Sequence, residues 1–146
     1  MSRPRVRIHG VGPMDLARTA AAFATAVVVE VGLRSLDLPR LSRLLGVPLD
    51  TAPAREAHAD DLVVVPHWAR RRLAASRRAL AYWPFGDSCL RVALVGGFLV
   101  RDLAPILRIG VARHHGEVKA HAWLEIGGRS LDPGSVDFLP VERIRS

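Results

Sequence analysis

The sequence predicts an α+β fold in which a mainly helical N-terminal part precedes a small antiparallel sheet. Apolar residues recur at helical spacing over residues 15–36 and again over residues 66–82. A third helix, over about residues 88–103, is apolar on most sides, which predicts a central, buried position. Short alternating segments separated by glycine-bearing turns follow Pro105, and such segments are typical of antiparallel strands.

Length and composition predict one globular domain with a substantial core. The chain has 146 residues, of which 49% are hydrophobic. We expect residues 1–84 to form a helical scaffold and residues 85–146 the catalytic core. The formal charge is +7, carried almost entirely by arginine, and Lys119 is the only lysine. Aromatic residues make up only 5% and no nucleic-acid-binding motif is present, so no nucleic-acid partner is expected. A basic surface also suits an acidic peptide.

Cysteine usage favours a reducing compartment. The chain has one cysteine, which cannot form an internal disulfide. The apolar run Ala20–Val29 lies between Arg18 and Glu30 and is too short to span a bilayer. The basic residues near the N-terminus lie too far from this run for a signal peptide. We therefore expect a cytoplasmic protein without a membrane span.

Three helices are predicted before residue 85, over residues 15–36, 40–46 and 66–82. Residues 1–13 are expected to form a loose tail or a short edge strand. In the helix of residues 15–36, apolar residues recur at Leu16, Phe23, Val27 and Val31. A short helix is expected over residues 40–46. Residues 47–61 are expected to form a loop or to contain a short helix over residues 53–59.

The helix of residues 66–82 carries a basic face. Pro66 suits its first turn. Its predicted buried stripe consists of Ala69, Leu73, Leu80 and Trp83. Four arginines, Arg70, Arg71, Arg77 and Arg78, form two pairs spaced seven residues apart, so they share a face. This face is either solvated surface or a docking surface for an acidic peptide or partner.

The expected strands cover residues 106–113, 118–126 and 129–132, and a last short strand lies within residues 136–144. His114, His115 and Gly116 form the first turn, and Gly127 and Gly128 form the second. Two adjacent histidines in a turn, without further ligands, make a poor metal site, so no metal is expected.

Cys89 is placed where a thiol becomes a nucleophile. Asp87 and Ser88 are both good N-cap residues, so Cys89 falls in the first turn of the central helix. The unpaired backbone N–H groups of a helix start favour a thiolate and can stabilise the oxyanion of a tetrahedral intermediate. The alternative is that a lone cysteine is a small buried hydrophobic residue.

His121 and Asp132 supply the remaining parts of a thiol hydrolase. With Gly127 and Gly128 as turn residues, Trp123 faces Asp132 across the hairpin. Alternation places His121 on the same strand face as Trp123, so Asp132 lies diagonal to His121. A carboxylate there can orient the imidazole, and Trp123 can exclude water. Taken singly, His121 could be a core histidine and Asp132 a turn residue.

These residues resemble those of the stand-alone transglutaminase-like cysteine proteases of lasso-peptide biosynthesis. The resemblance covers about residues 83–138. It rests on Cys89-Leu90 after small polar residues, on the apolar helix, on the strand of residues 107–111, and on residues 120–125 followed by Asp132. It implies a papain/transglutaminase-like fold, with N-terminal helices and a central Cys-bearing helix packed on a small antiparallel sheet. It also implies a Cys89-His121-Asp132 triad.

The resemblance further implies an activity and its partners. Such a cysteine endopeptidase removes the leader peptide from a ribosomally made lasso-type precursor before an ATP-dependent cyclase closes the macrolactam. A separate recognition protein presents the leader. Ser88 and Trp123 would then lie near the substrate. No phosphate-binding loop is present, and no cofactor is expected. The alternatives are a transglutaminase-like acyl transferase and a non-catalytic peptide-binding module.

Overall fold

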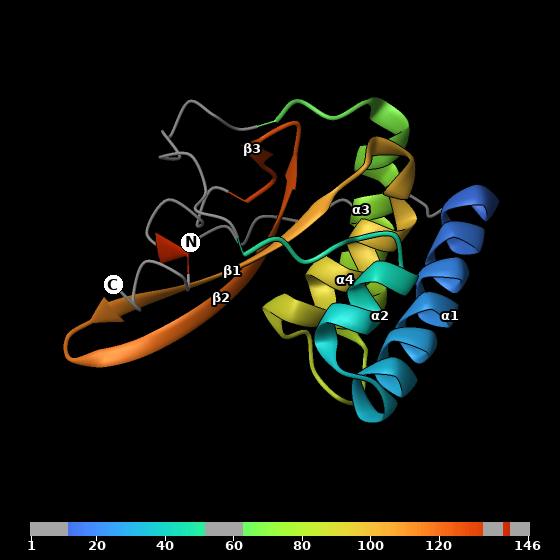
Figure 1. The fold of residues 1–146 in the computed structure, drawn as a ribbon. Helices are drawn as coiled ribbons and strands as arrows, with labels where there is room; N and C mark the ends of the chain where they lie inside the picture. The colour runs from blue at the N-terminus through green and yellow to red at the C-terminus, as the bar shows by residue number, and fades with distance from the viewer. Residues whose placement is uncertain (1–11, 52–62, 133–138, 141–146) are drawn as a thin grey trace, which may run out of the picture.

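The fold is α+β: in the part of the chain that the structure describes, four α-helices pack together and beside a small antiparallel sheet (Figure 1). The computed structural model describes residues 12–51, 63–132 and 139–140. The helices are α1 (Pro13–Ser35), α2 (Leu38–Leu44), α3 (His67–Ala81) and α4 (Cys89–Leu99), with a 3-10 turn, η1, at Arg101–Leu103. The strands are β1 (Ile106–His114), β2 (Glu117–Ile126), β3 (Arg129–Ser130) and β4 (Leu139–Pro140).

The face of α1 that packs against α3 and α4 differs from the predicted one. Leu16, Val27 and Val31, which mark the predicted apolar stripe, are exposed. The buried face instead carries Ala22 and Ala26, whose small side chains let the neighbouring helices approach closely. Because α1 is apolar on nearly all sides, its hydrophobic pattern alone does not specify which side is buried.

Helix α1 is also longer than the apolar run seen in the sequence. It has 23 residues, with a mean hydropathy of 1.6 in its most apolar window, and is long and apolar enough to cross a membrane. Core helices of soluble proteins and signal sequences meet the same criteria. The apolar segment is therefore longer than predicted, and both the absence of a membrane span and the cytoplasmic location stay predictions.

Helix α4 lies between the other helices and the sheet, as its composition predicts (Figure 1). Leu94 and Val95 are fully buried. Gly96 faces α3, because a Cβ atom there would lie 3.1 Å from Leu73 Cδ2. Gly97 faces Val47, and a Cβ atom there would lie 2.8 Å from both of its methyl groups. The glycine pair therefore marks a close approach, as predicted.

The sheet has the strand order β3-β2-β1-β4, and all its strand pairs are antiparallel. The predicted two-glycine turn is confirmed, with φ of +59° at Gly127 and +78° at Gly128. The first turn is shorter than predicted, because His114 belongs to β1. The tip of the β1–β2 hairpin extends past the helices, whereas residues 122–125 of β2 are buried (Figure 1).

Other boundaries shift by a few residues. Helix α4 ends at Leu99 rather than near Leu103, because the chain tightens into η1 before Ala104 takes a left-handed conformation (φ +50°). The third strand ends at Ser130, two residues early. The predicted N-terminal tail and the optional helix of residues 53–59 lie outside the described residues, apart from Gly12 and Pro13.

Candidate active site

Cys89 is the first residue of α4, and Ser88 is the N-cap. The backbone N–H of Arg91 donates to Ser88 Oγ at 3.5 Å, a long capping bond. The thiol is partly exposed and forms no disulfide. Because α4 is central and buried, its N-terminus is held in place by the packing of the whole helix. The structure thus presents the chain's only thiol in the first turn of a helix, where backbone N–H groups have no partner within the helix.

His121 and Asp132 form the contact that the sequence predicts. His121 Nε2 lies 2.5 Å from Asp132 Oδ2, within hydrogen-bonding distance. The strand pairing Ile126–Arg129 matches the predicted register. Strand β3 is too short to bring Asp132 into the ladder; instead, the hydroxyl of Ser130 accepts from the Asp132 N–H and donates to its C=O, both at 3.0 Å. This local turn positions the carboxylate.

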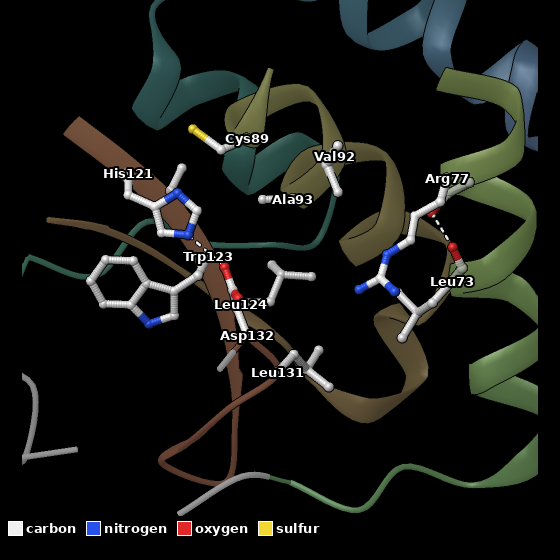
Figure 2. A pocket seen from close by; sticks show the side chains of 12 residues that line it. Leu73, Arg77, Cys89, Val92, Ala93, His121, Trp123, Leu124, Leu131 and Asp132 are labelled. Carbon is white, nitrogen blue, oxygen red and sulfur yellow. Dashed lines mark hydrogen bonds and ion pairs between the residues drawn. The ribbon is translucent and has the colours of Figure 1, made fainter. Parts of the chain in front are cut away.

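Cys89 lies on the other side of the imidazole. Figure 2 shows one ring nitrogen of His121 directed at Asp132 and the other on the side of Cys89. Since Nε2 contacts Asp132, the nitrogen on the thiol side is Nδ1. The thiol, the imidazole and the carboxylate therefore follow one another in the order that nucleophilic catalysis by a thiol needs.

The three side chains line one cavity of about 200 Å³. Helix α3, helix α4, strand β2 and the residues after β3 form its walls (Figure 2). The lining residues are Leu73, Ser76, Arg77, Cys89, Val92, Ala93, His121, Ala122, Trp123, Leu124, Leu131 and Asp132. The cavity is thus largely apolar, with the reactive groups at one end.

Trp123 supports the imidazole and is itself fixed by a buried ion pair. The rings of His121 and Trp123 stack, with centroids 6.0 Å apart and an interplanar angle of 18°. The indole N–H of Trp123 donates to Glu125 Oε1 at 3.2 Å. Arg108 Nε donates to the other oxygen of Glu125 at 2.9 Å and also pairs with Asp50. Trp123 is therefore held in one orientation against His121.

A second ion pair joins α1 to the start of α4. Arg91 Nε donates to Glu30 Oε2 at 2.8 Å, and Arg91 Nη2 donates to Oε1 at 3.3 Å. Arg91 Nη1 lies 3.4 Å from Ser88 Oγ. The hydrogen bond from Arg91 holds the pKa of Glu30 below its ordinary value, although burial opposes this. The nearby indole N–H of Trp83 also lowers the pKa of Glu30. The geometry of the described residues gives this N–H no hydrogen-bond partner, so its effect is weaker than that of Arg91.

The structure brings together every residue that the sequence singled out for the site. Cys89, His121, Trp123 and Asp132 share the cavity, and Ser88 caps the helix beside it. Among the described residues, no group of three or more His, Cys, Asp or Glu side chains could hold a metal ion.

Sequence reasoning missed three features at or near the site. Arg77 lines the cavity, Arg108 fixes Glu125, and Glu30 pairs with Arg91. The signal for Glu30 was present, because it is a carboxylate directly after an apolar run. A charge in that position needs a buried partner, but the sequence does not say which arginine provides it.

The sequence of the chain matches a known protein family. Residues 19–143 match the family model described as the Transglutaminase-like superfamily. The matched segment includes α4, β2 and all three residues of the candidate triad. No significant match was found among curated proteins or among solved structures.

Proposed function

Because this chain belongs to the transglutaminase-like superfamily, whose members are typically cysteine-dependent enzymes, we propose that it is a cysteine endopeptidase acting through Cys89, His121 and Asp132. The observation that carries the proposal is the contact between His121 Nε2 and Asp132, with Cys89 on the Nδ1 side of the ring. This order gives each group a distinct chemical task.

In the proposed mechanism, His121 Nδ1 takes the proton from the Cys89 thiol. The thiolate attacks the carbonyl carbon of the scissile peptide bond, and a C–S bond forms. Backbone N–H groups at the start of α4 stabilise the resulting oxyanion. The imidazolium then gives its proton to the leaving amine as the C–N bond breaks. Asp132 holds the ring in the required orientation and stabilises its charged form throughout.

Water completes the reaction. It attacks the thioester carbonyl while His121 accepts one of its protons, and a C–O bond forms. The C–S bond then breaks, the peptide leaves with a free carboxyl group, and His121 returns the proton to the Cys89 thiolate. A stacked, immobilised Trp123 limits the access of further water to one side of the imidazole. The apolar walls of the cavity have the same effect around the thioester.

The proposed substrate is the leader segment of a ribosomally made, lasso-type precursor peptide. The support is the resemblance of residues 120–125, together with Cys89 and Asp132, to the leader peptidases of lasso-peptide biosynthesis. The proposed partners follow from it: a separate protein that presents the leader, and an ATP-dependent macrolactam cyclase that acts on the product. The cytoplasm is the proposed location.

An acyl transferase is the second candidate, because the family name itself refers to transglutaminase chemistry. The two candidates share the thioester and differ only in whether water or an amine resolves it. Product mass separates them, since hydrolysis adds one water across the broken bond, whereas transfer leaves the acyl group attached to the amine.

The decisive experiment measures cleavage of the precursor peptide by mass spectrometry, with and without the recognition protein. Cleavage by the wild-type chain should disappear in Cys89→Ala, while circular dichroism shows an unchanged fold. The recognition protein should accelerate cleavage by raising the effective concentration of the leader. Retained turnover in Cys89→Ala would refute thiol catalysis, and equal rates with and without the second protein would refute the partner. If neither hydrolysis nor transfer occurs under any of these conditions, the peptide-binding module becomes the better explanation.

A further inference from the structure

The cavity continues beyond the triad into the space between α3 and α4. Its volume of about 200 Å³ is smaller than the roughly 300–1,000 Å³ of pockets that enclose a whole small molecule. A cavity of this size suits a single side chain of a peptide whose backbone passes Cys89. Ala93, Leu124 and Leu131 line it, so the bound portion of that side chain is apolar near the thiol.

The α3 side of this cavity is not apolar. Arg77 lines it, and Figure 2 shows its side chain extending from α3 toward the centre of the pocket. No hydrogen bond or ion pair within the described part of the chain engages its guanidinium group. Two other arginines of α3 form ion pairs: Arg71 lies 3.5 Å from Asp15 Oδ1, and Arg72 lies 3.8 Å from Asp102 Oδ2.

The arrangement has a defined chemical complement. A guanidinium group presents several N–H donors in a plane, which match the two oxygens of a carboxylate. Asp132, whose carboxylate also lines the cavity, already contacts His121, and within the described part of the chain it does not pair with Arg77. A ligand that fills the cavity therefore contacts apolar side chains near Cys89 and the guanidinium group of Arg77 on the α3 side.

We propose that Arg77 forms an anion-binding subsite, which selects peptides with a carboxylate one side chain away from the scissile bond. The proposal deepens the proposed function, because it assigns a substrate class to the same thiol site. The carboxylate can belong to an aspartate or glutamate side chain or to a free C-terminus. The other residues of the basic face have no part in the subsite.

The subsite can be tested without hydrolysis, because Cys89 is the only thiol in the chain. The probes are N-bromoacetyl-glutamate α-amide and N-bromoacetyl-glutamine α-amide, which differ only in one negative charge. A second pair, N-bromoacetyl-leucine as free acid and as amide, places the charge at a C-terminus instead. In each reaction the thiolate attacks the methylene carbon, a C–S bond forms and bromide leaves. Intact-protein mass spectrometry gives the rates.

Wild-type protein should react with one acidic probe roughly three- to tenfold faster than with its neutral partner, as expected for a charge-assisted contact with an exposed arginine. Arg77→Ala should bring this ratio close to one, and Arg77→Glu should invert it. Arg70→Ala is the matched control, since it removes the same charge from the same helix face but lies outside the cavity lining. It should leave the ratio unchanged.

The two probe pairs decide the source of the carboxylate, because only the pair with the correctly placed charge should show the effect. The neutral probes report whether each variant keeps an accessible, folded thiol site. A ratio that is the same in wild type, Arg77→Ala and Arg77→Glu would overturn the subsite. Failure of the proposed peptidase would look different: the charge preference would persist while no peptide bond is cleaved.

Discussion

Replacing Gly97 by alanine should destabilise the protein by forcing α4 away from its neighbours. The added methyl group would lie 2.8 Å from Val47 Cγ1 and from Cγ2, and 3.2 Å from Leu124 Cδ2. Val47 is 0% exposed and Leu124 is 5% exposed, so neither side chain can move into solvent. Leu124 and His121 both belong to β2, and Cys89 belongs to α4. The strain therefore falls between the helix that carries the nucleophile and the strand that carries the base.

The magnitude follows from two opposing effects. Overpacking by one methyl group in a dense core costs about 1–3 kcal/mol, and the two 2.8 Å contacts with a fully buried side chain place this site in the upper part of that range, about 2–3 kcal/mol. Replacing glycine by alanine inside a helix returns about 1 kcal/mol. We therefore expect the free energy of unfolding to fall by about 1–2 kcal/mol, a large part of the roughly 5–15 kcal/mol that holds a typical domain folded.

Gly96→Ala is the matched control. Its methyl group would lie 3.1 Å from Leu73 Cδ2, the end of a flexible and only partly buried side chain, and 3.7 Å from Ser76 Oγ. A small movement of Leu73 relieves this contact, so the helix-forming preference of alanine should offset the cost.

The assay is urea unfolding followed by circular dichroism, with the midpoint and slope compared for wild type and both variants. The midpoint should fall for Gly97→Ala and stay close to wild type for Gly96→Ala. A Gly97→Ala protein as stable as wild type would refute the close packing of α4 on Val47. Equal losses in both variants would mean that a general property of the helix, rather than this contact, sets the cost.

Three further predictions concern the triad and the ion pair between Glu30 and Arg91. His121→Ala should reduce precursor cleavage nearly as much as Cys89→Ala, because the same imidazole moves both protons; single-turnover rates of the purified variants test this. Asp132→Asn should retain at least about tenfold more activity than His121→Ala, and Asp132→Ala less than Asp132→Asn, because an orienting group matters less for a thiol than for a hydroxyl; wild-type rates in Asp132→Ala would contradict its place in the triad. Glu30→Gln should weaken folding at neutral pH but make it less sensitive to acid. Since the pKa of Glu30 is lowered in the folded state, its contribution is complete above the ordinary value of 4.5 and is lost as the pH falls below it; urea unfolding at several pH values measures the difference, and parallel pH profiles for wild type and Glu30→Gln would refute the argument.

Local features of the site could be read from the sequence because short-range backbone rules determine them. Ser88 precedes an apolar segment and caps it, which places Cys89 at the helix start. Gly127 and Gly128 accept the left-handed conformations of a two-residue turn. This turn sets the pairing of Ile126 with Arg129, and from that register the approach of Asp132 to His121 follows within a few residues.

Other features depend on which surfaces meet, and only the tertiary structure decided them. Helix α1 is apolar around most of its circumference, so periodicity could not show that the face with Ala22 and Ala26 is the buried one. Glu30 and Arg91 are separated by 61 residues, and their pairing follows from the packing of α1 on α4. Arg77 likewise shares a sequence pattern with its neighbours on α3, and only the position of α3 beside α4 directs it into the cavity. Sequence periodicity describes a helix in isolation, whereas burial and charge pairing are properties of two elements in contact.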